Sequence, residues 1–394
     1  MKKAAVMTRW LAVAGLWATA PVFSGCLGPV SLHEAVLGYD ETVSRLEQQM
    51  LLINIARLRA GLSGHFTVTS SIAATFDYQT NAAILGPFSD IGINVGVSAA
   101  ENPTLSIVPI QGKQFTERVL TPFDDAKFEF LVFQGSPIDM VMRLMADGIE
   151  LQTQKGTFLR FLLNWPTHPL EYEDFRRIAM HLAWLNATRR LFVGRLSFLE
   201  RTQARLSSPP TAADVQNALE KDWRWRPVAG DGVYALERRV TGRVVITNYD
   251  PRTLSDAERD GLNTRAAENP GNFVLVDIRP DHPGGDLPLF GALKLRSLNL
   301  IASFLAADHG GNREFDVTKD PRTGDSGPNP RRVLGIEVAD QAPPSMIPNA
   351  RYGGRYYSVA NTPWDREAFR LLYQLFQMTV TDVSGVGVPI TISK

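Results

Sequence analysis

The stretch that decides the fold is LHEAVLGYDETVSRLEQQMLLINIARLRAGLSGHFTVTSSIAATFDY, residues Leu32–Tyr78. Over residues 32–59, apolar side chains recur at alternating steps of four and three, which is the spacing of one helical face. From Leu51 onward this face widens, so we expect the second half of the helix to be buried more deeply than the first. Gly61 and Gly64 end the helix, because glycine adopts the left-handed conformation common at helix C-termini.

The amphipathic helix expected at residues 32–59 has two interpretations. Its stripe of apolar residues fits a coiled coil or a helix that binds a partner. Its widening from Leu51 to Leu58 fits a spine that packs within its own domain. We favour the spine, because about three heptads only just reach the length typical of coiled coils.

After Gly64 the apolar period changes toward two, and residues 65–78 are rich in β-branched and aromatic side chains. Further strand-like and helix-like patterns follow along the chain. Strands are predicted over 91–97, 104–108, 273–278, 352–359 and 386–392, and helices over 113–120, 136–145 (with Ser136 as its N-cap), 170–191, 254–267, 289–306 and 363–377. Residues 222–248 are predicted to form three short strands, 222–227, 233–238 and 243–247, joined by turns at Gly230, Gly232 and Gly242. The predicted fold class is α+β, in which a long N-terminal amphipathic helix packs with antiparallel strands and further helices.

Residues 1–25 have the features of an export signal. The N-terminal region is positively charged through Lys2, Lys3 and Arg9, and it is followed by an apolar run of eleven residues, Trp10–Ala20. A helix that spans a bilayer needs about 20 apolar residues, so this run is too short to be one.

Phe23-Ser24-Gly25-Cys26 resembles a bacterial lipobox, in which small residues precede an invariant cysteine. The resemblance implies cleavage before Cys26 by signal peptidase II and a lipid on the new N-terminal cysteine. Phe23 departs from the usual Leu, Val or Ile at its place. The alternative is an ordinary signal peptide with an incidental cysteine. Cys26 is the only cysteine, so it has no disulfide partner within the chain, and lipidation explains a lone thiol in an oxidising compartment.

Leu27, rather than an aspartate, follows the cysteine. By resemblance to enterobacterial sorting rules, this implies the outer membrane rather than retention at the inner one. The expected location is therefore the cell outer membrane, with a soluble body that faces the periplasm and is tethered by its N-terminal lipid.

Three blocks of the chain resemble consecutive segments of a widespread family of uncharacterised bacterial lipoproteins. They are LLINIARLRAGLSGHFTVTSSIAA (Leu51–Ala74), NPTLSIVPIQGKQFTERVLTPF (Asn102–Phe123) and QGSPIDMVMRLMADGIE (Gln134–Glu150). The first contains an LLxNIxRxR-type motif, and Leu295–Leu298 and Tyr356–Ile392 are also similar. The resemblance implies an envelope lipoprotein. It implies no established activity, so no catalytic residue carries over.

The charge balance excludes some classes of partner. The chain has 41 Lys and Arg against 41 Asp and Glu; without residues 1–25 the balance is 38 against 41, a formal charge of −3. With no basic tail, we expect no nucleic-acid partner. The expected partners are the membrane, through the lipid, and other envelope proteins.

The length suggests two domains. We expect an α+β domain over residues 26–206 and a second α+β region over 207–394, joined by a Ser/Pro-rich linker that begins at Ser207. Residues 309–332 have few apolar side chains and are expected to form a mobile loop.

No motif of an established catalytic class is present: GxSxG, HExxH and GxxxxGK[ST] are all absent. The candidate site residues are His65, next to the Gly/Ser turn, and His282 and His309, each beside an aspartate and glycines. Asp, His and Gly are also common turn formers, so structural roles are the favoured interpretation. His181 is expected to be a core histidine. We expect no cofactor and no metal site.

Three classes of function remain. The favoured one is a lipid-anchored envelope protein with a structural or interaction role. The others are an envelope hydrolase with a site assembled from distant residues, and a ligand-binding lipoprotein. A deep polar pocket that holds His65, His181 or His282 would favour one of the latter two.

Overall fold

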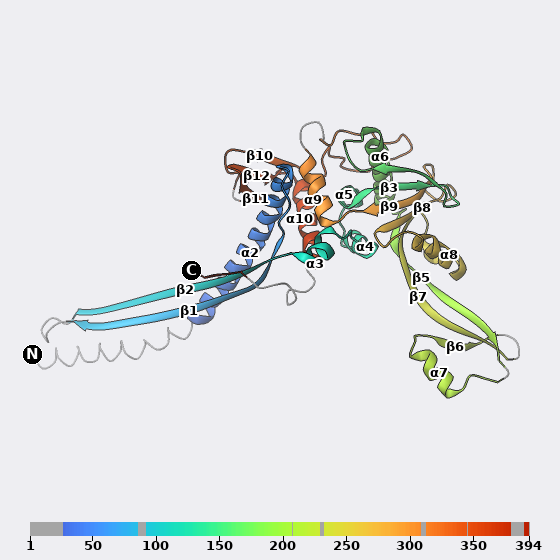
Figure 1. Ribbon diagram of the computed structural model, residues 1–394, viewed down its shortest axis with the longest axis horizontal. Coiled ribbons are helices and arrows are strands. Elements are labelled where there is room, and N and C mark those ends of the chain that lie inside the picture. The colour runs from blue at the N-terminus through green and yellow to red at the C-terminus, as the bar shows by residue number, and fades with distance from the viewer. Residues whose placement is uncertain are drawn as a thin grey trace, which may run out of the picture.

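The computed structural model describes residues 27–85, 92–206, 208–228, 232–308, 313–344, 346–379 and 390–393. The fold is mixed α+β, and two β-ribbons project from a central body of helices and sheets (Figure 1). Among the residues named above, the signal with its Phe23-Ser24-Gly25-Cys26 motif, Ser207 at the start of the expected linker, Gly230, and His309 lie outside the described ones.

Helix α2 spans Leu27–Arg59, 33 residues and therefore about 50 Å. Its first half lies at the surface, where Val36 is 55% exposed, whereas Leu52 in its second half is fully buried. The second half contacts α9 (Leu298–Ala307) and β11 (Asn349–Tyr352). The widened apolar face therefore lies against elements of the same chain.

The LLxNIxRxR motif builds the turn that follows α2. The side-chain oxygen of Asn54, which is 2% exposed, accepts the backbone N–H of His65 at 2.6 Å. Arg57 donates to the carbonyl of Ser63 at 3.0 Å, and Gly61 has a φ of 75°. A Cβ on Gly64 would lie 2.9 Å from the Phe66 ring, so glycine is needed there.

The first ribbon is a long hairpin of β1 (Thr67–Leu85) and β2 (Gly92–Pro109). The short strand β13 (Ile390–Ser393) pairs antiparallel with β2 near the body. The two separate strands expected at 91–97 and 104–108 are thus one continuous strand, because both pair with β1 in a single hairpin ladder. The C-terminal strand was expected at 386–392, and its described part is 390–393.

The main sheet has the strand order β4-β3-β9-β8-β7-β5, with β6 added beside β7. All its pairs are antiparallel except β7–β8, which α8 connects. The strands are β3 (Ala146–Gln152), β4 (Phe158–Leu163), β5 (Phe192–Arg205), β6 (Arg224–Pro227), β7 (Val233–Thr247), β8 (Phe273–Ile278) and β9 (Leu289–Leu295). The division expected at residues 206 and 207 falls between β5 and α7, so strands from both sides share this sheet.

The remaining elements surround the sheet and α2. The helices are α3 (Gly112–Phe115), a π-helix (Thr116–Leu120), α4 (Asp125–Phe133), α5 (Ile138–Met145), α6 (Pro169–Ala187), α7 (Ala212–Leu219), a 3-10 turn (Pro251–Thr253), α8 (Asp256–Ala267) and α10 (Pro363–Gln377). A third sheet has the order β10 (Ile336–Ala339), β12 (Arg355–Val359), β11.

Several sequence predictions were wrong. The helix expected at 289–306 is a strand, β9, followed by α9, which Ser297 caps; periodicity alone does not separate short apolar strands from buried helices. Ser136 is not the cap of α5: Pro137 takes that position, and the Ser136 hydroxyl has no partner. The strand expected at 352–359 is a hairpin, β11–β12, turned by two glycines with positive φ.

The turn expected at Gly242 is also absent, because β7 continues through this glycine with only a β-bulge, where the register with β5 shifts between the pairs Arg195–Val244 and Ser197–Thr241. A Cβ on Gly242 would lie 2.3 Å from the amide oxygen of Asn263, and that oxygen accepts the backbone N–H of Arg243 at 2.8 Å. Glycine here makes room for the contact between α8 and the strand.

The largest apolar cluster extends from α2 to α10, and a smaller one lies under α8. At its edge, the buried carboxylate of Glu47 accepts hydrogen bonds from the Tyr373 hydroxyl and from Gln377, each at 2.7 Å. Burial and this carboxylate raise the pKa of Tyr373 to about 12. The first and last described helices are therefore joined by polar contacts as well as by packing.

We predict that Asn54→Ala lowers the free energy of unfolding by about 1–3 kcal/mol, because the buried N–H of His65 loses its acceptor. Asn217→Ala, on the exposed face of α7, is the control and should change stability by less than about 0.5 kcal/mol. Urea denaturation measures both, and equal effects would contradict the role given to Asn54.

Candidate functional site

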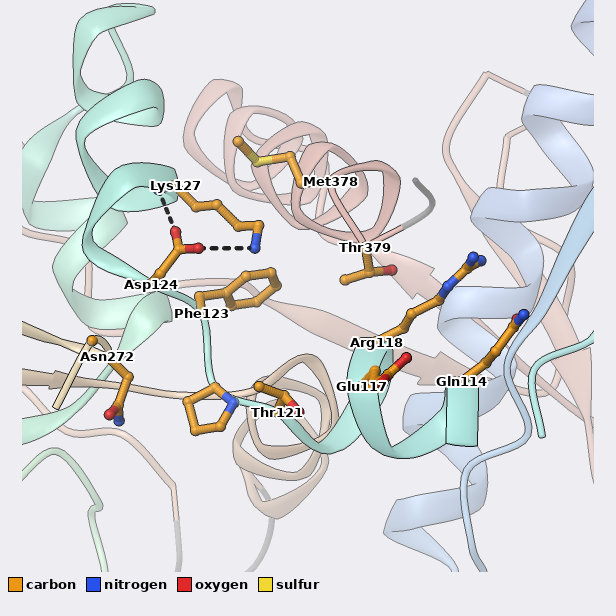
Figure 2. A pocket seen from close by; sticks show the side chains of 12 residues that line it. Gln114, Glu117, Arg118, Thr121, Phe123, Asp124, Lys127, Asn272, Met378 and Thr379 are labelled. Carbon is orange, nitrogen blue, oxygen red and sulfur yellow. Dashed lines mark hydrogen bonds and ion pairs between the residues drawn. The ribbon is translucent and has the colours of Figure 1, made fainter. Parts of the chain in front are cut away.

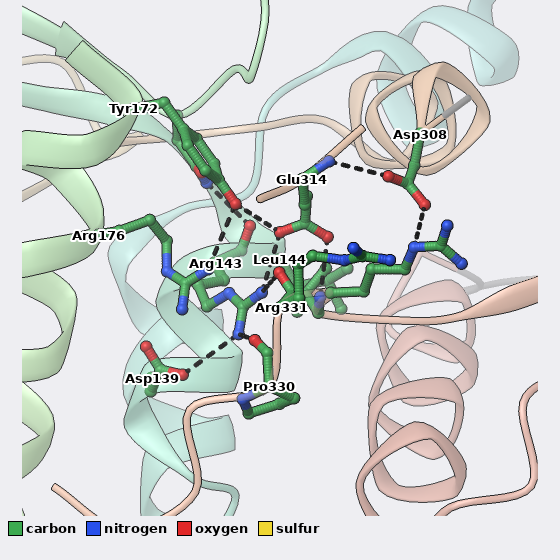
Figure 3. Close-up of polar contacts among 12 residues, drawn as sticks. Asp139, Arg143, Leu144, Tyr172, Arg176, Asp308, Glu314, Pro330 and Arg331 are labelled. Carbon is green, nitrogen blue, oxygen red and sulfur yellow. Dashed lines mark hydrogen bonds and ion pairs between the residues drawn. The ribbon is translucent and has the colours of Figure 1, made fainter. Parts of the chain in front are cut away.

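A cluster of buried charges lies where α5, α6 and residues 313–332 meet (Figure 3). The Arg143 guanidinium, which is fully buried, donates to Glu314 at 2.9 Å and lies 3.6 Å from Asp139. The Tyr172 hydroxyl donates to the same Glu314 oxygen at 2.8 Å. Burial and the Glu314 charge raise the pKa of Tyr172, so this hydroxyl stays protonated.

The cluster fastens residues 313–332 to the body. Arg143 donates to the carbonyls of Pro330 and Arg331, each at 2.9 Å, and Glu314 accepts the N–H of Val333 at 2.8 Å. Arg176 donates to the side chain of Asn329. This segment has neither helix nor strand, as expected for a loop, but its contacts with the core are extensive.

His181 joins the same segment to a second turn. Its side chain is 1% exposed; Nδ1 lies 3.0 Å from the Thr323 hydroxyl and Nε2 lies 3.2 Å from the Gly284 carbonyl. Burial lowers the pKa of His181, which keeps the ring neutral. His181 is therefore a core histidine with both ring nitrogens partnered, as the sequence predicts.

Of the candidate histidines, the structure describes His65 and His282, and they lie in separate turns. His65 is exposed at the turn after α2, and its backbone N–H is bound by Asn54. The His282 ring lies 4.9 Å from the Tyr249 ring and 3.9 Å from the Asp281 carboxylate, in a turn held by backbone hydrogen bonds. Within the described residues, no group of three or more His, Cys, Asp or Glu side chains could hold a metal ion.

The motif Leu295–Leu298 holds a further buried arginine, besides Arg143 and Arg176. Arg296 donates to the Asn164 carbonyl at 2.5 Å and to the Arg143 carbonyl at 3.2 Å, and its guanidinium lies 3.9 Å from the centre of the Phe304 ring. Burial lowers the pKa of Arg296, and the nearby Asp147 carboxylate opposes this effect. These contacts join α5, β4 and α9, so the motif has a structural role.

A cavity of about 580 Å³ lies between the π-helix, the start of α4 and the end of α10 (Figure 2). Gln114, Glu117 and Arg118 line one side, Asp124 and Lys127 the other, with Met378 and Thr379 between them. Asp124 is already engaged, since it caps α4 by accepting the N–H of Lys127 at 2.9 Å and pairs with the Lys127 ammonium at 3.4 Å.

The cavity contains charges of both signs and no histidine, serine or cysteine. It can hold a small polar molecule or an extended segment, and its lining contains no Ser–His or Cys–His pair. The sequence analysis did not identify it. One signal was available, because six of its lining residues come from the block Asn102–Phe123 that resembles the lipoprotein family.

A second cavity, of about 630 Å³, lies between the exposed half of α2 and the segment before β11. Asp40, Glu41 and Arg45 line the helix side, and Met346, which is 94% exposed, lies on the other. Arg45 pairs with Glu41 at 2.6 Å. This cavity likewise contains none of the candidate histidines.

Compared with protein-family models, with curated proteins and with solved structures, the chain shows no significant match. Among the helices that the structure describes, none is long and apolar enough to cross a membrane.

We predict that Glu314→Ala destabilises the protein by about 3–5 kcal/mol, because Arg143 then keeps a buried charge without its carboxylate partner. The double variant Arg143→Met, Glu314→Leu should recover much of this loss, because it removes both charges and fills the space. Glu337→Ala, at an exposed site of β10, is the control. A Tm for Glu314→Ala equal to that of the control would contradict the prediction.

We also predict that His181 makes stability fall as the pH drops. The unfolded chain takes up a proton on His181 near pH ~6.5, whereas burial lowers the folded-state pKa. Unfolding therefore binds a proton below about pH 6.5, and the free energy of unfolding decreases there. His181→Gln should flatten this dependence, and His168→Gln, at an exposed site, should not. Urea denaturation at several pH values measures how the free energy of unfolding changes with pH. The same pH dependence in His181→Gln as in the wild type would refute the assignment.

Proposed function

We propose that this protein is a lipid-anchored component of the bacterial cell envelope, held at the outer membrane by Cys26, with a structural or interaction role. The proposal places it among the uncharacterised lipoproteins that its sequence blocks resemble. The observation that carries it is the continuity of α2, which is helical from Leu27, the residue after Cys26, and places Leu51, Leu52 and Ile55 of its second half in the core.

The continuity of α2 supports a lipid anchor that is joined mechanically to the folded body. A lipid on Cys26 would be joined to the body by one helix, about 50 Å long. The first half of that helix leaves Val36 and Leu37 exposed, and the β1–β2 hairpin projects from the body beyond it (Figure 1). Exposed apolar side chains and a projecting ribbon are features of surfaces that bind other proteins.

A ligand-binding lipoprotein is the second candidate. The cavity beside the π-helix supports it, because that cavity has a volume typical of small-molecule sites and is lined by one of the resembling blocks. π-helical turns also occur frequently at functional sites. The described residues offer no comparable support for the hydrolase.

Cys26→Ser tests the anchor. We expect the wild-type chain to incorporate radiolabelled palmitate and to fractionate with the outer membrane, and the variant to lose the label and the membrane association. Ser24→Ala, which keeps a small residue in the motif, is the control and should retain both. A labelled Cys26→Ser variant, or one with unchanged fractionation, would exclude the anchor.

Chemical cross-linking of intact cells tests the interaction role in the same strains. The wild-type chain should enter cross-linked products with other envelope proteins, and Cys26→Ser should lose them. A wild-type chain found only as a monomer would exclude the interaction role while leaving the lipid anchor in place.

A further inference from the structure

The second ribbon is a three-stranded arm made of β5, β7 and β6, which projects from the main sheet and carries α7 at its end (Figure 1). Register places Arg201 of β5 and Arg224 of β6 on either side of Glu237 in β7. Residues that lie directly opposite on neighbouring strands point to the same face of a sheet. Arg201, Glu237 and Arg224 therefore form one row on one face.

Two more arginines belong to this face. Arg239 lies two residues beyond Glu237 on β7, and Arg226 lies two residues beyond Arg224 on β6. We call Arg201, Arg224, Arg226 and Arg239 the arginine face. All four side chains are exposed.

The arginine face has an excess of positive charge. Glu237 lies 2.6 Å from Arg201 and 4.0 Å from Arg226, and its own side chain is only 13% exposed. Arg239 donates to the Ser197 hydroxyl at 3.3 Å. Neither Arg224 nor Arg239 has a carboxylate partner within the described part of the chain. Four guanidiniums around one carboxylate give this face a formal charge of +3, although the whole chain is neutral.

The opposite face of the arm is balanced. Glu200 pairs with Arg238 at 2.6 Å, and the Arg238 guanidinium lies 4.6 Å from the centre of the Trp223 ring. Trp225, on the same side as Leu236, donates to the Asp214 carbonyl of α7 at 3.4 Å. The positive charge is thus confined to one face.

We propose that the arginine face binds the anionic headgroups of a lipid bilayer. The guanidinium group presents a planar fork of donors that matches phosphate oxygens. Four of them on a sheet face make a broad array, and neither described cavity lies beneath it.

The bilayer contact does not depend on Cys26. In Figure 1 the arm projects to the right of the body, whereas α2 and the β1–β2 hairpin lie to the left, so the two attachments are separate. The lipid anchor and bilayer binding by the arginine face can therefore be tested separately, and either can be refuted without the other.

The test uses the full chain with Cys26→Ser, so that no lipid is attached. Co-sedimentation is measured with vesicles of phosphatidylcholine and phosphatidylglycerol in equal parts, and with vesicles of phosphatidylcholine alone. We expect binding to the anionic vesicles to exceed binding to the neutral ones and to weaken as salt is added. Equal binding to both kinds of vesicle would overturn the proposal.

Arg224→Gln with Arg239→Gln removes the two arginines that lack a carboxylate partner. We expect this pair to weaken binding to anionic vesicles by at least about tenfold, since each basic residue near an anionic surface contributes severalfold. The matched control, Arg366→Gln with Arg370→Gln, removes two exposed charges of α10 and should bind as before. Tm measurements confirm that both variants are folded.

Two results would overturn the proposal at this stage. One is an equal loss of vesicle binding in the two double variants, which would mean that net charge alone decides. The other is tighter binding to soluble poly-glutamate than to anionic vesicles, together with loss of poly-glutamate binding in Arg224→Gln with Arg239→Gln. That result would make an acidic protein segment the partner instead.

Discussion

The burial of the Arg143 guanidinium is the constraint on which the body of this protein depends. A buried charge costs several kcal/mol unless carboxylates and carbonyls surround it. Here the carboxylate comes from Glu314 and the carbonyls from Pro330 and Arg331, all far along the chain from α5. Residues 313–332, which form neither helix nor strand, must therefore pack against α5. Their path is fixed by the N–H donors of Arg143.

The sequence allowed good prediction where a periodic segment has clear end signals. The strand at Phe273–Ile278 and the helix at Pro363–Gln377 have the expected bounds, and Thr362 caps that helix. Prediction failed at 289–306, where an apolar run fits strand and helix equally well. It also missed the contacts of residues 313–332, because the pairing of Glu314 with Arg143 spans 171 positions and leaves no local pattern.

The candidate site residues were likewise predictable only where a local sequence pattern exists. The structural role expected for His181 is visible in its two partners, while His65 and His282 lie apart at turns. The cavity beside the π-helix could not be predicted, because its walls come from segments as distant as Gln114 and Thr379. The arginine face was hidden for a related reason. Its charges are spread over three strands, and only their register places them on one surface.

The strand order of the main sheet has a consequence for biosynthesis. Strand β3 lies between β4 and β9, and β9 is made only after β5, β7 and β8. As the chain is synthesised, one edge of β3 therefore stays open until most of the sheet has emerged. An open strand edge invites pairing with other chains, and sheets closed by distant strands form slowly. Until β9 arrives, the newly made chain therefore needs protection from aggregation at this edge.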